Sequence, residues 1–148
     1  MDKKTEINNA VKESMKSGDE VRKRTLRMVM AAIKQIEIDR RISIDDAAVL
    51  SILQKEIKLR KEALDEAKKA NREDLAVDAQ AEIDVLNVFL PQALGADELR
   101  ALVQATILEI GATAPADMGK VMKALLPKIA GRAPGDQVSA LVRELLQK

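Results

Sequence analysis

The chain has 148 residues, 25 basic and 24 acidic, and a net charge of +1, so any positive surface has to come from local arrangement. The absence of Cys and His excludes disulfides, thiolate or imidazole metal sites, and Ser–His or Cys–His nucleophile pairs. The apolar runs are too short to cross a bilayer, and residues 1–6 lack the apolar core of a signal peptide. We therefore expect a cytoplasmic protein without a membrane partner.

The first part of the sequence predicts four amphipathic helices, because apolar residues return every three or four positions. The predicted ranges are 4–17, 20–40, 45–70 and 73–89. Gly18 ends the first helix, and Asn71 breaks the pattern between the third and the fourth. Ser43 is expected to cap the third helix, with Asp46 in the place of the capping-box glutamate.

Pro91 marks the predicted boundary between two helical subdomains, residues 1–91 and 92–148, because proline disfavours helical geometry in the residue before it. Three shorter helices are predicted after it, over residues 97–110, 117–130 and 134–146. Residues 113–116 are expected to form a linker, and Pro127 is expected to bend the second of these helices or end it early. The sequence thus predicts an all-α fold.

Two lysines stand out on the predicted helix 117–130. Lys120 and Lys123 lie opposite the apolar face that contains Val121 and Leu125, and Lys128 and Arg132 follow just past them. Few carboxylates oppose them, so a phosphate-contacting surface is one of two equally supported interpretations. In the alternative interpretation, Asp117 and Gly131 are caps and the lysines only solvate the helix.

A second basic ridge is predicted on the helix 20–40, where Lys23, Arg27 and Lys34 lie opposite the apolar stripe. A solvated helix face is the simpler explanation for this ridge. The charged residues of the helices 45–70 and 73–89 are likewise expected to form solvated faces with ion pairs four residues apart. No motif predicts a catalytic residue, a metal site or a cofactor.

Several segments resemble the GatB/YqeY family, in which stand-alone YqeY-like proteins share the tail domain of the GatB subunit of Asp/Glu-tRNA amidotransferase. The most specific segment is Asp117-Met118-Gly119-Lys120-Val121-Met122 together with Gly131-Arg132-Ala133 and Gly135. Leu53-Gln54-Lys55-Glu56-Ile57-Lys58, Ala70-Asn71-Arg72-Glu73-Asp74-Leu75 and Leu90-Pro91-Gln92 resemble the N-terminal half. The resemblance covers essentially the whole chain.

The resemblance implies an all-helical N-terminal part joined to a tail-type domain of three helices. In the amidotransferase, the tail helps to hold the tRNA body, and the glutaminase and kinase centres lie in other domains. We therefore expect a non-catalytic, monomeric accessory module that binds tRNA. The expected contacts are Lys120, Lys123, Lys128 and Arg132, with Gly119 and Gly131 allowing close approach and Lys23, Arg27 and Lys34 extending the footprint.

Two other functions stay open at this point. The chain could be a protein-interaction module that docks on an aminoacyl-tRNA synthetase, an amidotransferase or the ribosome through the helix 45–70. The general label for the family implies a third function, a carbon–nitrogen ligase with glutamine as amido-N-donor. The chain has no P-loop and no Cys or His nucleophile, which places this reaction last.

Overall fold

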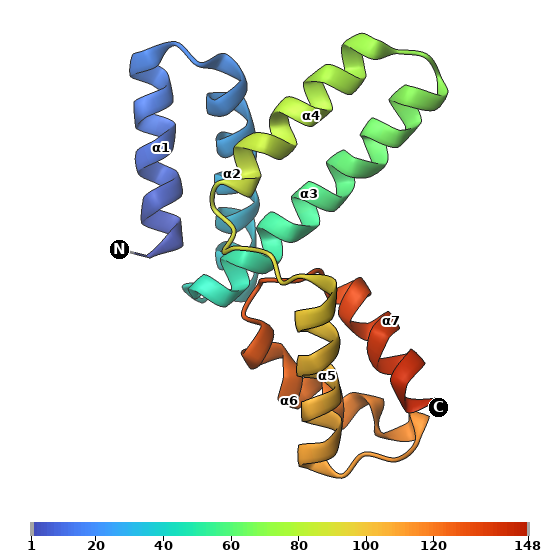
Figure 1. Ribbon diagram of the computed structural model, residues 1–148. Helices are drawn as coiled ribbons and strands as arrows, with labels where there is room; N and C mark the ends of the chain where they lie inside the picture. Colours follow the sequence, from blue (N-terminus) through green and yellow to red (C-terminus); the bar gives the residue numbers. More distant parts are fainter. Residues whose placement is uncertain (1, 148) are drawn as a thin grey trace. The chain divides into compact units, whose positions relative to one another are not determined.

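The computed structural model describes residues 2–147, and within this range it contains seven α-helices, one short 3-10 helix and no strand (Figure 1). The predicted all-α fold is confirmed. The chain divides into two compact units, Met1–Leu90 and Pro91–Lys148, which we call the first and the second unit. The helices are α1 (Lys3–Ser17), α2 (Glu20–Arg40), α3 (Asp46–Lys69), α4 (Glu73–Asn87), α5 (Ala96–Ile110), η1 (Pro115–Asp117), α6 (Met118–Ile129) and α7 (Gly135–Leu146).

The first unit consists of two antiparallel helical hairpins, α1–α2 and α3–α4, with α2 packed against both helices of the other hairpin (Figure 1). The turns between the helices use left-handed backbone conformations, at Gly18 (φ 76°) and at Asn71 (φ 56°). Burial of one apolar face of each helix stabilises the unit. The fully buried side chains of this core include Ile7, Leu26, Val29, Ile33, Val49, Leu53 and Leu86.

The start of α3 differs from the prediction, because Asp45 and not Ser43 is its N-cap. The Asp45 Oδ1 atom accepts a hydrogen bond from the Ala48 N–H group at 2.9 Å. The neighbouring Asp46 accepts from the Lys3 N–H group at 3.0 Å, so this carboxylate binds the start of α1 and forms no capping box. The fourth helix also ends earlier than predicted, at Asn87.

The second unit is a three-helix bundle in which α5, α6 and α7 each pack against the other two. Its core lies between the apolar faces of the three helices and is separate from that of the first unit. The predicted linker 113–116 is partly ordered as the 3-10 turn η1. The fully buried side chains of this core are Val103, Val121, Leu125, Val138 and Val142.

Pro127 does not end α6 early, since the helix continues to Ile129. Proline removes one N–H donor, and here the helix has only two further residues after it. The helix therefore loses the one hydrogen bond from position 127 to the Lys123 carbonyl, near its end. The side chain of Pro127 is exposed, on the side of α6 away from the buried Val121 and Leu125.

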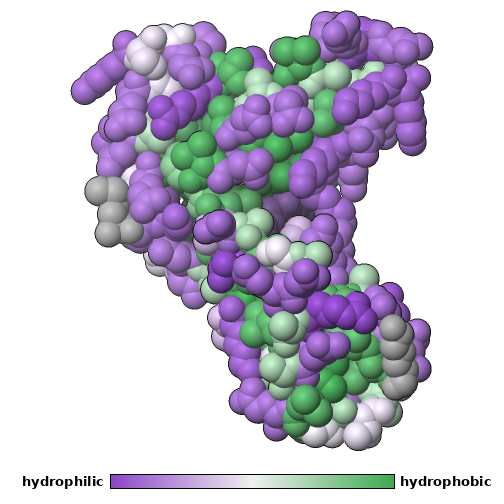
Figure 2. Space-filling model, viewed as in Figure 1, coloured by the Kyte–Doolittle hydropathy of each residue, from purple (hydrophilic) through white to green (hydrophobic). Residues whose placement is uncertain are grey.

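The surface of the first unit carries apolar area as well as charge. Figure 2 shows hydrophobic surface along α4 and toward the α1–α2 hairpin, interrupted and bordered by hydrophilic residues. Between residues 2 and 147, no helix is long and apolar enough to cross a membrane. Contiguous exposed apolar surface on a protein commonly marks an interaction site.

Candidate nucleic-acid interface

Lys120 and Lys123 project from α6 on the side away from the core of the second unit. The buried side chains Val121 and Leu125 fix the inner face of the helix, and the periodicity of the helix places both lysines outward. Both side chains are exposed, and neither forms an ion pair with any residue in the range 2–147. The two ammonium groups are thus accessible to an anionic partner.

Gly119 lies in the first turn of α6, beside Lys120. A Cβ atom built at this position meets no heavy atom within 4 Å, so the fold does not require glycine for packing. The backbone is exposed here, and a bulky ligand group such as a phosphate can approach it closely.

Asp117 precedes α6, but its carboxylate caps the turn before the helix. Its Oδ2 atom accepts hydrogen bonds from the N–H groups of Thr113, at 3.1 Å, and Ala114, at 3.3 Å. These bonds lower the pKa of the Asp117 carboxyl, with a smaller contribution from the charge of Lys120. The carboxylate therefore stays ionised and orders the turn that leads into α6.

Lys128 is held by α5. Its Nζ atom lies 2.5 Å from Glu109 Oε2 and donates a hydrogen bond to Thr106 Oγ1 at 3.3 Å. The hydroxyl of the buried Thr106 in turn donates to the carbonyl of Leu102 at 2.8 Å. The ammonium group of Lys128 is thus shared with a carboxylate of its own unit and links α6 to α5.

Arg132 connects the turn after α6 to the segment before α5. Its Nε atom donates to the carbonyl oxygen of Gln92 at 2.9 Å, and the Leu94 N–H group donates to the Arg132 carbonyl at 2.8 Å. Glu98 lies 3.9 Å from the guanidinium group. The left-handed conformation of Gly131 (φ 79°) aims the chain into this arrangement. Arg132 therefore has a clear structural role in the second unit.

The ridge expected on α2 is only partly accessible. Lys23 pairs with Glu20 at 2.9 Å, and the guanidinium group of Arg27 contacts Met15 Sδ at 3.3 Å. Lys34 is exposed and makes no ion pair with the described residues. Of the nine residues expected to contact nucleic acid, the structure leaves three exposed lysines outside ion pairs among residues 2–147, namely Lys34, Lys120 and Lys123.

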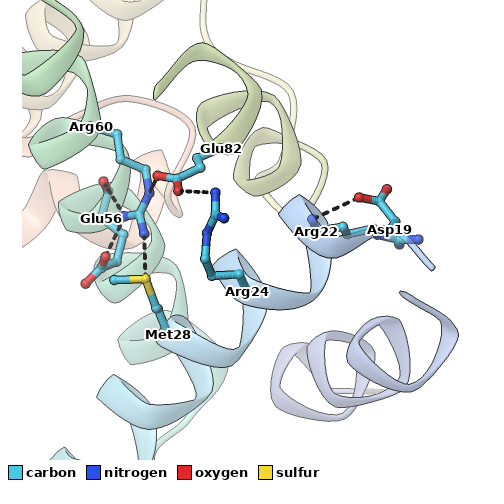
Figure 3. A network of polar contacts seen from close by, with 7 residues as sticks. All are labelled: Asp19, Arg22, Arg24, Met28, Glu56, Arg60 and Glu82. Atoms are coloured by element: carbon cyan, nitrogen blue, oxygen red, sulfur yellow. Dashed lines mark hydrogen bonds and ion pairs between the residues drawn. The ribbon is translucent and has the colours of Figure 1, made fainter. Parts of the chain in front are cut away.

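The polar network around Arg60 is the main feature that the sequence reasoning missed (Figure 3). The Arg60 side chain is buried, and it binds Glu82 through Nε at 2.9 Å and Glu56 through Nη1 at 2.6 Å. Arg24 binds the second oxygen of Glu82 at 3.3 Å, and Met28 Sδ lies 3.7 Å from Arg60 Nη2. The network joins α2, α3 and α4.

These residues were expected to be solvated, yet the sequence contained a signal. Arg60 lies three residues after Ile57 and four before Leu64, so it occupies a position of the apolar stripe of α3. A charged residue at such a position needs a partner of opposite charge. The partner Glu82 comes from α4, and the α3 sequence alone could not identify it.

A family model described as "Yqey-like protein" matches residues 4–146. The chain belongs to the YqeY-like family. This family is related to the tail domain of GatB, so the recognised resemblance is confirmed.

The curated relatives of this chain include fungal proteins named "Altered inheritance of mitochondria protein 41, mitochondrial". The relative from Pyrenophora tritici-repentis is 30% identical over 141 residues, which cover 92% of this chain and 76% of that protein. Those from Lachancea thermotolerans and Eremothecium gossypii are 31% and 34% identical, cover 66% and 70% of this chain, and are themselves covered to 53% and 58%.

The names of these YqeY-like relatives correct one expectation. The sequence was interpreted as that of a cytoplasmic protein, whereas the relatives from all three fungi are named as mitochondrial. The expectation rested on the short apolar runs and on the composition of residues 1–6, and neither feature identifies the compartment of a protein. The cytoplasmic assignment is therefore wrong.

Proposed function

We propose that this YqeY-like protein is a non-catalytic accessory module that binds the tRNA backbone through Lys120 and Lys123 of α6. The observation that carries the proposal is the exposure of both lysines, outside ion pairs with residues 2–147, next to the open backbone of Gly119. The relationship of the family to the GatB tail supports tRNA as the nucleic acid. Such a surface contacts phosphates and gives salt-sensitive binding.

The chemistry of the chain also favours backbone contact over base recognition. Phe89 is its only aromatic residue, and that side chain is buried in the first unit. Without exposed aromatic rings, the protein has no aromatic platform for unpaired bases, so we expect little sequence preference. We propose no amide-forming reaction, because the chain contains no Cys or His nucleophile.

The test is fluorescence anisotropy of labelled tRNA with the full-length protein across a series of salt concentrations. We expect the logarithm of the affinity to fall linearly with that of the salt concentration. The Lys120→Ala/Lys123→Ala variant should bind more weakly and lose about two units of this slope, since it removes two phosphate contacts. Arg132 and Lys128 stay unchanged in this variant, because their side chains hold the second unit together.

A matched control removes the same charge elsewhere. Lys68 and Lys69 at the end of α3 are exposed, and the Lys68→Ala/Lys69→Ala variant should keep most of the affinity and the slope. If both variants lose affinity equally, binding reports only net charge and the α6 site is wrong. A Lys34→Ala variant tests whether α2 extends the footprint.

A further inference from the structure

The helix α4 is unusual in charge. It carries five carboxylates and no basic residue over Glu73–Asn87. Glu82 is bound by Arg60 and Arg24, and Asp74 is bound by Arg72. The other three, Glu73, Asp78 and Asp84, are exposed and form no ion pair with residues 2–147.

An apolar stripe runs along the same exposed side of α4. Val77, Ala81 and Val88 lie within about 40° of one another around the helix axis, at 100° per residue. Val77 is 62% exposed and Val88 is 75% exposed, although both are apolar. On the same projection, Glu73 and Asp84 border one edge of the stripe and Asp78 borders the other.

A hollow of about 590 Å³ adjoins the stripe at the end of the α3–α4 hairpin. Val77 belongs to its lining, together with the apolar Leu64, Ala67 and Ala76 and the polar or charged Lys68, Asn71, Arg72, Glu73 and Gln80. Because α4 packs on α3 and α2, its other side is left for a partner. An apolar stripe beside a hollow can receive the anchoring side chains of an amphipathic helix.

We propose that the exposed face of α4 docks a basic amphipathic helix of a protein partner. Val77, Ala81 and Val88 would pack against its apolar side, and Glu73, Asp78 and Asp84 would pair with the lysines or arginines beside it. This surface is distinct from the α6 lysines. Its carboxylates would repel a nucleic-acid backbone, so a protein is favoured as the occupant.

The probe is a fluorescent helical peptide of about 15 residues, the length of α4, with leucines along one side and lysines elsewhere. Binding to the full-length protein is measured by anisotropy. One control peptide has glutamates in place of the lysines, and another has the same composition with the leucines scattered around the helix. We expect both control peptides to bind at least about tenfold more weakly than the probe.

Protein variants locate the surface. Val77→Asp/Val88→Asp should weaken binding of the probe about tenfold or more, because charges replace the apolar contact. Asp78→Asn/Asp84→Asn should weaken binding and flatten its salt dependence. Leu108→Asp is the matched control, since Leu108 on α5 is 82% exposed and lies outside the proposed surface. Circular dichroism checks that each variant keeps its helices.

The outcomes separate this inference from the tRNA proposal. Lys120→Ala/Lys123→Ala should bind the probe like the unchanged protein, whether or not it binds tRNA. Equal binding of the lysine and glutamate peptides, or equal loss in the Leu108 and Val77/Val88 variants, would overturn the docking surface. A loss of tRNA affinity in the Asp78/Asp84 variant would also overturn it, since α4 would then face nucleic acid.

Discussion

Arg60 joins three helices of the first unit through one guanidinium group. Its side chain is 8% exposed, and the side chains of Glu56 and Glu82 are 18% and 20% exposed. The guanidinium group also donates to the Glu56 carbonyl at 3.0 Å. A pair that is this enclosed differs from the surface pairs of the same unit, because removal of one partner leaves charges in a poorly solvated site.

We therefore expect Arg60→Met to lower the free energy of unfolding of the first unit by about 2–4 kcal/mol, because it leaves Glu56 without its partner and Glu82 with only the more exposed Arg24, both in a partly dry site. Urea unfolding followed by circular dichroism measures the change. Arg72→Met is the control, because Arg72 and Asp74 are 57% and 65% exposed and should contribute little. Equal stability of the Arg60 variant and the unchanged protein would show that the network is not stabilising. Adding Glu82→Gln should recover part of the loss.

At the scale of the helices, the sequence predicts what is local. The apolar stripe of α2 is contained within one segment of the sequence, and α2 has its predicted bounds. The role of Asp46 could not be predicted in this way, because the Lys3 N–H group that it binds lies 43 residues earlier in the chain. At the candidate nucleic-acid interface, the spacing of the apolar residues of α6 predicted that Lys120 and Lys123 are exposed.

The partners of the other basic residues could not be predicted in this way. Lys128 pairs with Glu109 on α5, and Arg132 binds the Gln92 carbonyl, which lies 40 residues earlier in the chain. Such contacts arise only when helices pack against one another, and periodicity within one helix carries no information on them. The same holds for Arg60, whose position in the apolar stripe indicates burial but does not identify Glu82 as its partner.

The end of α6 offers a test of backbone geometry. Ala130 follows the helix in a left-handed conformation (φ 48°), whereas α1 and α5 end at glycines in the same conformation. A side chain is strained there, so Ala130→Gly should raise the stability of the second unit by about 0.5–1 kcal/mol. The same substitution at Ala105, exposed within α5, should lower it by about 1 kcal/mol. Thermal unfolding distinguishes the two, and a loss of stability in the Ala130 variant would contradict the argument.

At the scale of the whole molecule, charge is distributed unevenly even though the net charge is only +1. The carboxylates of α4 belong to the first unit, and the exposed lysines of α6 belong to the second. The positive surface of α6 favours an anionic partner, and the negative surface of α4 favours a cationic partner. An adaptor that binds tRNA through one unit and a basic protein helix through the other fits this distribution.

The separate cores also predict how the chain unfolds. The first core ends with Phe89 and Leu90, and the second begins with Leu94, so a cut between residues 90 and 91 leaves both cores whole. We expect a fragment of residues 1–90 to unfold cooperatively, at about the temperature at which the first unit unfolds within the full-length protein. The fragment 91–148 should fold with a lower midpoint, because a smaller domain buries a smaller fraction of its surface.

A shorter fragment tests the role of Arg132 in that second unit. A fragment of residues 96–148 lacks both the Gln92 carbonyl that binds the guanidinium group and the Leu94 N–H group that binds the Arg132 carbonyl. It also lacks the apolar side chain of Leu94, which packs against the second core. Its melting temperature, measured by circular dichroism, should therefore fall below that of the fragment 91–148. Equal melting temperatures would mean that the segment before α5 contributes nothing to the fold, and Arg132 would then be available for the tRNA contact expected from the sequence.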